Sequence, residues 1–133
     1  MTLQEREAHA CAIIDSMAIK LRDVSLYLHD NPELGLNEHK AVKVINQFLE
    51  THNFTSQVGL TDLPELQTAL RGDYNGTAQH KIAFLGEYDA LPELGHGCGH
   101  NLIAMMSLGA AIAFSQSAPE AWGTTFFGCP AEE

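Results

Sequence analysis

The stretch from residue 82 to residue 101 constrains the fold most, because an apolar run gives way there to a loop crowded with reactive side chains. The run from Ile82 to Leu85 is short and breaks at Gly86, as expected for a strand that ends in a loop. Burying carboxylates, imidazoles and a thiol together costs free energy unless they are paired or bind a metal. The crowding therefore indicates chemistry at the end of a strand. Within fourteen positions the loop contains Glu87, Asp89, Glu93, His96, Cys98 and His100.

Glycines alternate with the reactive residues in the second half of this loop. They let the backbone turn tightly and approach a ligand without steric clashes from a Cβ atom. A second group of reactive residues follows another short apolar run at 124–128, which predicts a further strand. That strand leads into Pro130-Ala131-Glu132-Glu133.

Two amphipathic helices are expected before residue 50. Apolar residues recur at three- and four-residue spacing over 3–30, and Pro32 ends this pattern because the residue before a proline disfavours helical angles. The spacing over 41–49 is the most regular in the chain. Asn37 is placed to cap the second helix, with Glu38 in its first turn.

Three short strands are expected in the middle of the chain, at 54–58, 67–71 and 81–85. An Asn-Gly pair within 72–76 is typical of a turn. We therefore expect the strands at 67–71 and 81–85 to form an antiparallel hairpin with a longer loop.

Residues 101–114 are apolar nearly all round, which predicts a buried helix that packs against the sheet. The expected order is helix, helix, two or three strands, helix, strand. This order indicates a layered α/β fold, helix-sheet-helix, with functional loops at strand ends.

Composition excludes several classes of function. The chain has 133 residues, a net charge of -10 and no cluster of basic residues, so a nucleic-acid partner is not expected. No apolar run approaches the roughly 18 residues of a membrane span, and the first residues do not resemble a signal peptide. We expect a cytoplasmic protein without a membrane partner. Three widely spaced cysteines do not suggest a disulfide framework.

Thiolate, imidazole and carboxylate side chains are the usual ligands of zinc-like metals. Cys98 and His100 are two residues apart, so both side chains can share one ion. Glu133 would add an oxygen ligand if the strand at 124–128 lies beside the strand at 82–86. Glu132 would then act as general base toward a metal-activated water, and Asp89 would orient an imidazole or contact the metal.

Structural roles are open for several of these residues. Cys98 alone could be an inert buried thiol, and His96 could be a ligand, a substrate contact or a residue that only hydrogen-bonds the loop. Cys11 and Cys129 are expected to be ordinary core thiols, and Glu93 a solvated carboxylate. The other histidines are expected to be solvated: His9, His29, His39, His52 and His80.

Four motifs together resemble the amidohydrolase branch of the aminoacylase-like zinc peptidases, which includes aminobenzoyl-glutamate hydrolases, carnosine-type dipeptidases and hydrolases of N-acyl amino acids. The resemblance covers the whole chain. Its motifs are Asn31-Pro32-Glu33-Leu34-Gly35, Gly86-Glu87-Tyr88-Asp89-Ala90-Leu91-Pro92, His96-Gly97-Cys98-Gly99-His100-Asn101 and Pro130-Ala131-Glu132-Glu133.

The resemblance implies roles for five residues. Cys98, His100 and Glu133 correspond to metal ligands, Glu132 to the catalytic base, and Asp89 to a residue that shapes the site. It implies a divalent metal as cofactor, with zinc favoured, manganese or cobalt as alternatives, and up to two ions in a full-length protein.

Two positions refine the resemblance. Sister branches have a histidine ligand where this chain has Glu87, so Cys98 would take over that coordination. Asn101 stands where many members have aspartate, which favours the aminobenzoyl-glutamate hydrolase and dipeptidase side of the family.

Family members are about three times as long as this chain. We therefore expect residues 1–133 to be the N-terminal portion of one catalytic domain, without the rest of that domain and without the lid or dimerisation domain.

Three functional hypotheses follow. The first is a metal-dependent hydrolase of amide bonds in a dipeptide or N-acyl amino acid, with a possible homo-oligomeric state and no activity expected from this chain alone. The second is a thiol hydrolase with Cys98 as nucleophile and His96 or His100 as base. The third is a non-catalytic remnant or partner-binding fragment with an exposed sheet edge.

Overall fold

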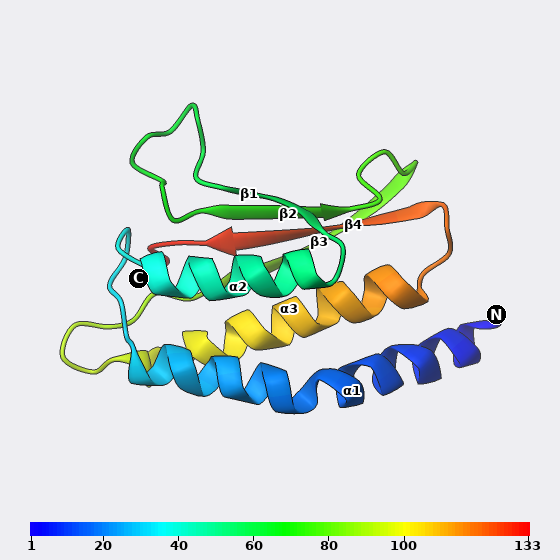
Figure 1. Ribbon diagram of the computed structural model, residues 1–133, viewed down its shortest axis with the longest axis horizontal. Helices are drawn as coiled ribbons and strands as arrows, with labels where there is room; N and C mark the ends of the chain where they lie inside the picture. Colours follow the sequence, from blue (N-terminus) through cyan, green and yellow to red (C-terminus); the bar gives the residue numbers. More distant parts are fainter.

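The computed structural model describes residues 1–133 and contains three α-helices and one four-stranded sheet (Figure 1). The helices are α1 (Leu3–Asp30), α2 (His39–Thr51) and α3 (His100–Ser117), and a 3-10 turn, η1, covers His96–Cys98. The strands are β1 (Thr55–Val58), β2 (Leu70–Tyr74), β3 (His80–Glu87) and β4 (Trp122–Cys129). The expected α/β class and the expected helices are confirmed.

The sheet has the order β1-β2-β4-β3, with β4 parallel to β3 and antiparallel to β2. The expected hairpin between the second and third strands is therefore wrong, because β4 lies between them. The strand expected at 67–71 is shifted to Leu70–Tyr74, so residues 72–74 extend it and do not belong to the turn. The turn is instead tied to the start of β4, since the Asn75 side-chain amide donates to the carbonyls of Glu120 and Trp122.

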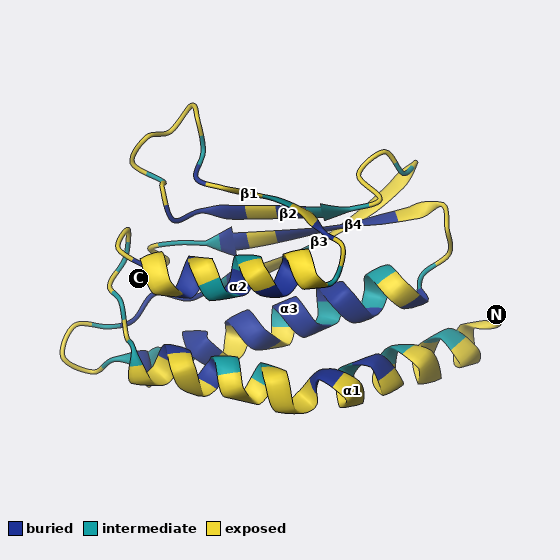
Figure 2. Ribbon diagram, in the orientation of Figure 1, coloured by how far each residue is buried: buried dark blue, intermediate teal, exposed yellow.

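Helices α2 and α3 pack on one face of the sheet, each against a strand glycine. A Cβ at Gly72 would lie 2.9 Å from Leu49 of α2, and a Cβ at Gly86 would lie 3.2 Å from the Ala104 backbone of α3. In the sheet register both glycines are on the face of Phe126, which is fully buried. The layered arrangement thus has the helices of this chain on one face, with α1 packed against α3 as an outer layer (Figure 2).

Helices α1 and α2 begin in different ways. Thr2 and Glu5 form a reciprocal capping box at the start of α1, which satisfies free backbone N–H groups there. The predicted Asn37 cap of α2 is wrong, because the N-cap is Glu38 and its side chain makes no capping hydrogen bond. The Glu33 carboxylate caps this helix from a distance, accepting the N–H groups of Lys40 and Ala41.

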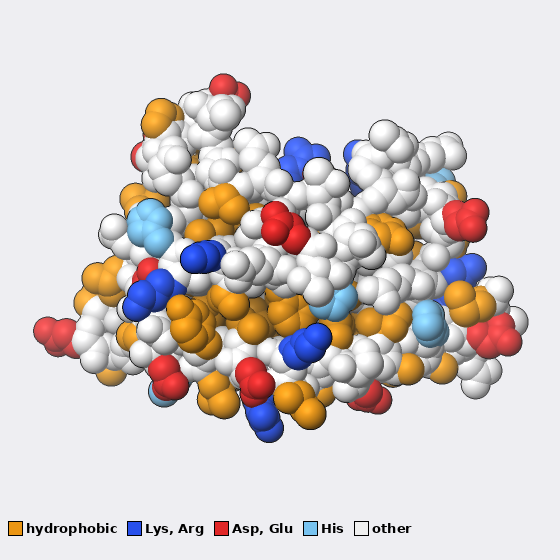
Figure 3. All heavy atoms as spheres, viewed as in Figure 1, with side chains coloured by type: hydrophobic (Ala, Val, Ile, Leu, Met, Phe, Trp, Pro, Cys, Tyr) orange, Lys and Arg blue, Asp and Glu red, His pale blue; other side chains and the backbone are white.

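Strand β3 forms one edge of the sheet, and its Leu85 side chain points to the face opposite the helices because it alternates with Gly86. It pairs only with β4, and Leu85 is 57% exposed. Hydrophobic side chains also reach the surface over the helical layer (Figure 3). No helix in this structure combines the length and the apolar character that a membrane crossing requires.

Candidate metal centre

The loop after β3 is buried at its start and hydrogen-bonded along its length. Tyr88, Asp89 and Ala90 are all buried directly after the strand. The Ala90 N–H donates to the Glu33 carbonyl, which joins this loop to the segment before α2. Gly99 adopts φ +88°, a left-handed conformation that favours glycine, and α3 begins at the next residue.

The chain end reaches the same edge of the sheet. Because β3 and β4 are parallel with Glu87 opposite Cys129, both strands end at the same side of the sheet. The expectation that the strand at 124–128 lies beside the strand at 82–86 is therefore confirmed. Residues 130–133 lie against the loop that carries Cys98 and His100.

Three potential ligands converge there. One ligand atom each from Cys98, His100 and Glu133 can be chosen so that all lie within 4.8 Å of one another. His100 Nε2 lies 3.8 Å from a Glu133 carboxylate oxygen and 3.3 Å from a Glu132 oxygen. A thiol, an imidazole and a carboxylate in such proximity match the donor set of a zinc-like ion.

Asp89 contacts every member of this cluster. Its carboxylate lies 2.9 Å from His100 Nδ1 and accepts the Glu133 N–H at 3.0 Å, while its carbonyl lies 3.8 Å from Cys98 Sγ. The His100 and Asp89 side chains are only 6% and 1% exposed. A hydrogen bond from Nδ1 to Asp89 selects the tautomer that leaves Nε2 free to bind a metal, so Asp89 is placed to orient the imidazole.

The electrostatics distinguish the two loop histidines. Burial alone would lower the pKa of His100, but the hydrogen bonds and negative charge of Asp89, together with Glu133, outweigh this effect and raise the pKa. Burial lowers the pKa of His96, and the neighbouring His100 adds to the shift. His96 is buried, its Nδ1 has no hydrogen-bond partner, and it is not part of the three-ligand cluster.

The remaining candidates have simpler environments. The expectation of a core thiol is wrong for Cys11, which is exposed on α1, whereas Cys129 is half-buried and burial raises the pKa of its thiol. Glu93 is exposed, as expected. His9, His29, His39 and His80 are exposed, but His52 is half-buried and stacks on Phe48.

Sequence analysis missed a buried carboxylate behind the chain end. Glu38 is fully buried, and its carboxylate accepts hydrogen bonds from the Thr68 hydroxyl at 2.6 Å and the Ala131 N–H at 2.8 Å. Tyr88 contributes a further hydrogen bond to the Thr68 carbonyl. The apolar periodicity of the sequence does not reveal the burial of Glu38, because its partners Thr68 and Ala131 are distant in sequence.

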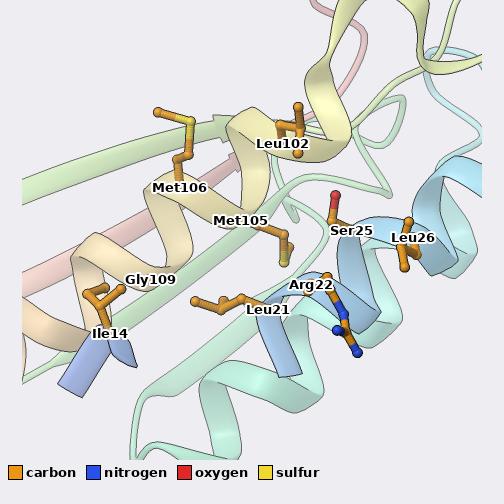
Figure 4. Close-up of a pocket in the computed structure, with 9 residues that line it drawn as sticks. All are labelled: Ile14, Leu21, Arg22, Ser25, Leu26, Leu102, Met105, Met106 and Gly109. Atoms are coloured by element: carbon orange, nitrogen blue, oxygen red, sulfur yellow. The ribbon is translucent and has the colours of Figure 1, made fainter. Parts of the chain in front are cut away.

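An apolar groove lies between α1 and α3, away from the ligand cluster (Figure 4). It contains none of the candidate site residues, and the side chains of Leu21, Leu102 and Met105 line it together with the backbone of Gly109. Nothing in its lining offers a metal ligand or a catalytic carboxylate.

Comparisons with known proteins relate the whole chain to one group of hydrolases. It is 34% identical to a mouse (Mus musculus) Xaa-Arg dipeptidase over 98% of this chain and 33% of the relative. It is 32% identical to a p-aminobenzoyl-glutamate hydrolase subunit from Escherichia coli over 84% of this chain and 26% of the relative. A search against family models matched none.

A solved structure supports the same relationship. The crystal structure of a dinuclear metal-binding peptidase of the M20 family from Bacillus subtilis superimposes with a TM-score of 0.75 and 25% identity, covering 89% of this chain and 36% of that protein. The chain spans between a quarter and a third of the length of the two curated relatives named above. The resemblance found in the sequence is confirmed, and the chain belongs to the M20 peptidase family, whose relatives are metal-dependent amidohydrolases and peptidases.

Proposed function

We propose that this chain carries the metal site and general base of a hydrolase that cleaves the amide bond of a dipeptide or an N-acyl amino acid. The observation that carries the proposal is the convergence of Cys98, His100 and Glu133 within 4.8 Å, with Asp89 behind them. The dipeptidase and aminobenzoyl-glutamate hydrolase named among the relatives support the substrate class.

The three side chains fit one divalent ion. Three protein ligands are the usual number at a catalytic zinc site, and zinc is the ion that this mixed sulfur, nitrogen and oxygen set favours over manganese or cobalt. A bound ion would lower the pKa of a coordinated water from about 15.7 to about 7 and would polarise the substrate carbonyl. A second ion, as in the dinuclear Bacillus subtilis peptidase, would need ligands beyond this set.

Glu132 is the residue that we propose to move the proton. Its side chain is 54% exposed, and a carboxylate oxygen lies 3.3 Å from His100 Nε2, next to the ligand cluster. A carboxylate at that position can accept a proton from the attacking water and donate it to the leaving nitrogen. Cys98, His100 and Glu133 would hold the ion, while Asp89 keeps the imidazole in its ligating orientation.

We further propose that residues 1–133 correspond to the N-terminal portion of one catalytic domain. The basis is that the chain matches only a quarter to a third of the length of these relatives. We also propose that the full-length protein has a lid or dimerisation domain, forms a homo-oligomer and is located in the cytoplasm. We propose that residues 1–133 alone have no activity. The intact mass of the protein made from its native gene tests the first: a mass about three times that of this chain is expected.

The structure favours the metal site over a thiol nucleophile. The hydrogen bond of Cys98 Sγ is to the Asp89 carbonyl, and none joins it to His96 or His100. A nucleophilic thiol would need such a base within hydrogen-bond reach. The open edge of β3 is the observation that supports a partner-binding fragment, and gel filtration showing a stable monomer would argue against it.

Titration of the 133-residue chain with Cd²⁺ tests the metal site, because cadmium–thiolate bonds absorb in the ultraviolet. One equivalent should bind to the wild-type chain and to Glu132→Gln, and Cys98→Ser should lose the absorption band. In a full-length protein carrying these residues, Glu132→Gln should lose turnover and keep the metal. Retained turnover would contradict the role of Glu132, and a wild-type chain that binds no Cd²⁺ would contradict the site.

A further inference from the structure

Glu38 is a buried carboxylate that the proposed reaction does not use. It stands at the start of α2, yet it makes no capping hydrogen bond to that helix. Its side chain points away from solvent, since the residue is fully buried. Burying a carboxylate is costly unless hydrogen bonds compensate, so its partners indicate what its position achieves.

Those partners lie in two segments far from Glu38 in sequence. One carboxylate oxygen accepts the Thr68 hydroxyl at 2.6 Å, and the other accepts the backbone N–H of Ala131 at 2.8 Å. Thr68 is fully buried, and its carbonyl accepts the hydroxyl of Tyr88, which precedes Asp89. Glu38 therefore links the core beneath the loop to the residue directly before Glu132.

The backbone at Ala131 needs such support. Ala131 has φ +53°, in the left-handed region that a residue with a Cβ adopts at a cost. It also packs closely on the segment before α2, because a Cβ at Gly35 would lie 2.9 Å from the Ala131 Cβ. Gly35 and Glu38 together define where the chain turns into the Glu132-Glu133 pair.

Two buried carboxylates thus hold the backbone on either side of Glu132. Glu38 accepts the N–H of Ala131, and Asp89 accepts the N–H of Glu133. Both carboxylates are fully buried, whereas Ala131 and Glu133 are exposed, so the two hydrogen bonds fix an exposed segment to the buried part of the chain. With its neighbours fixed, the Glu132 backbone has little freedom to move.

We infer that Glu38 is a positioning residue, which places Glu133 for metal binding and Glu132 for proton transfer by holding the Ala131 N–H. This inference rests on the proposed function of the Cys98, His100 and Glu133 cluster. Glu38 touches neither the ion nor the substrate. Its effect is transmitted through the backbone of the segment 131–133.

The test compares Glu38→Leu with Glu38→Gln in the 133-residue chain. Leucine has a similar size but cannot accept the Ala131 N–H. Glutamine keeps one acceptor oxygen for Ala131, and its amide can donate to the Thr68 hydroxyl. We expect Cd²⁺ affinity to fall about 10- to 100-fold in Glu38→Leu, the usual range for residues that orient metal ligands, and to stay near the wild-type value in Glu38→Gln.

Amide hydrogen exchange provides a readout that needs no metal. In the metal-free wild type and Glu38→Gln, the Ala131 and Glu133 amides should be protected. In Glu38→Leu, protection of Ala131 should be lost while amides in the middle of α2 keep theirs. Unchanged Cd²⁺ affinity together with unchanged protection of Ala131 in Glu38→Leu would overturn the inference.

A second pair of variants covers the case in which Glu38→Leu does not fold. Gly35→Ala should displace Ala131 and weaken Cd²⁺ binding, whereas Gly76→Ala, where a Cβ would meet only Asp73 at 3.5 Å, should not. Equal affinity in both would count against the inference. If the wild-type chain binds no Cd²⁺, the proposed function fails. In that case, hydrogen exchange of the Ala131 amide in Glu38→Leu, or in Gly35→Ala, decides whether Glu38 holds the segment 131–133.

Discussion

The two segments that meet at the candidate metal centre are held in different ways. The loop at 88–99 lies between β3 and α3 and contains its own backbone hydrogen bonds, between Leu91 and Gly95 and from Gly99 to His96. The segment at 130–133 follows β4, and the N–H groups that hold it donate to the side-chain carboxylates of Glu38 and Asp89.

The loop is held by backbone hydrogen bonds, whereas the segment at 130–133 is held by side chains, and the two should respond differently to mutation. Backbone hydrogen bonds inside a loop keep their geometry when a single side chain changes. A segment held by side chains depends on each of them, so one substitution can release it. We therefore expect the geometry of Cys98 and His100 to tolerate mutations elsewhere, and the geometry of Glu132 and Glu133 to be sensitive to them.

The largest effect is expected from His100→Ala. The substitution removes a proposed ligand at the start of α3 and leaves the buried Asp89 carboxylate without its His100 partner. Cd²⁺ affinity should fall by more than the roughly 100-fold that loss of an orienting partner costs. The measurement is a Cd²⁺ titration, with exposed His9→Ala as the matched control. A fall of less than about tenfold would show that the loop does not supply the main ligands.

A smaller effect is expected from Asp89→Asn, which separates the contributions of the two segments. An asparagine oxygen can accept from His100 Nδ1 or from the Glu133 N–H, but its amide nitrogen can replace neither acceptor. Cd²⁺ affinity should fall about 10- to 100-fold. Amide exchange at Glu133 then reports whether the terminal segment is the one released. Asp73→Asn, which changes a carboxylate bound to Arg71 and Thr125, should leave Cd²⁺ affinity unchanged.

The smallest effect is expected from pH. Lowering the pH should weaken Cd²⁺ binding, but it should increase the contribution of His100 to the stability of the metal-free chain. The raised pKa of His100 means that protons compete with the metal, so affinity should fall about tenfold for each pH unit below that pKa. In the metal-free chain the same shift adds stability that is fully present below the unfolded pKa of about 6.5 and is lost as pH rises through the raised pKa. Cd²⁺ titrations and urea unfolding at several pH values measure both, and a parallel trend in the two would contradict the assignment.

Local patterns make half of the site predictable. Cys98 and His100 lie two residues apart with Gly99 between them, so their proximity follows from the local sequence. The position of Glu133 beside them is also predictable, because a parallel pair of strands brings both strand ends to one edge. Whether these residues bind a metal stays a prediction.

The parts that sequence patterns miss depend on contacts between distant segments. The Asn75–Gly76 turn gives no sign that its amide binds the start of β4, so the predicted pairing of the strands is wrong. By its position Glu38 is a first-turn residue of a helix, and its partners Thr68 and Ala131 are 30 and 93 positions away. Periodicity describes one element at a time and carries no information of this kind.

The central position of β4 has a consequence for how the chain folds. Strand β4 follows β2 and β3 in the sequence, yet it lies between them, with both Tyr74 and Ile82 paired to Thr124. Neither neighbour can complete its hydrogen bonds before β4 is in place. Contacts of such long sequence separation slow folding, because a large loop must close before they form. During synthesis the nascent chain would therefore expose unpaired edges of β2 and β3 until β4 leaves the ribosome, and chaperones or aggregation would compete with folding during that interval.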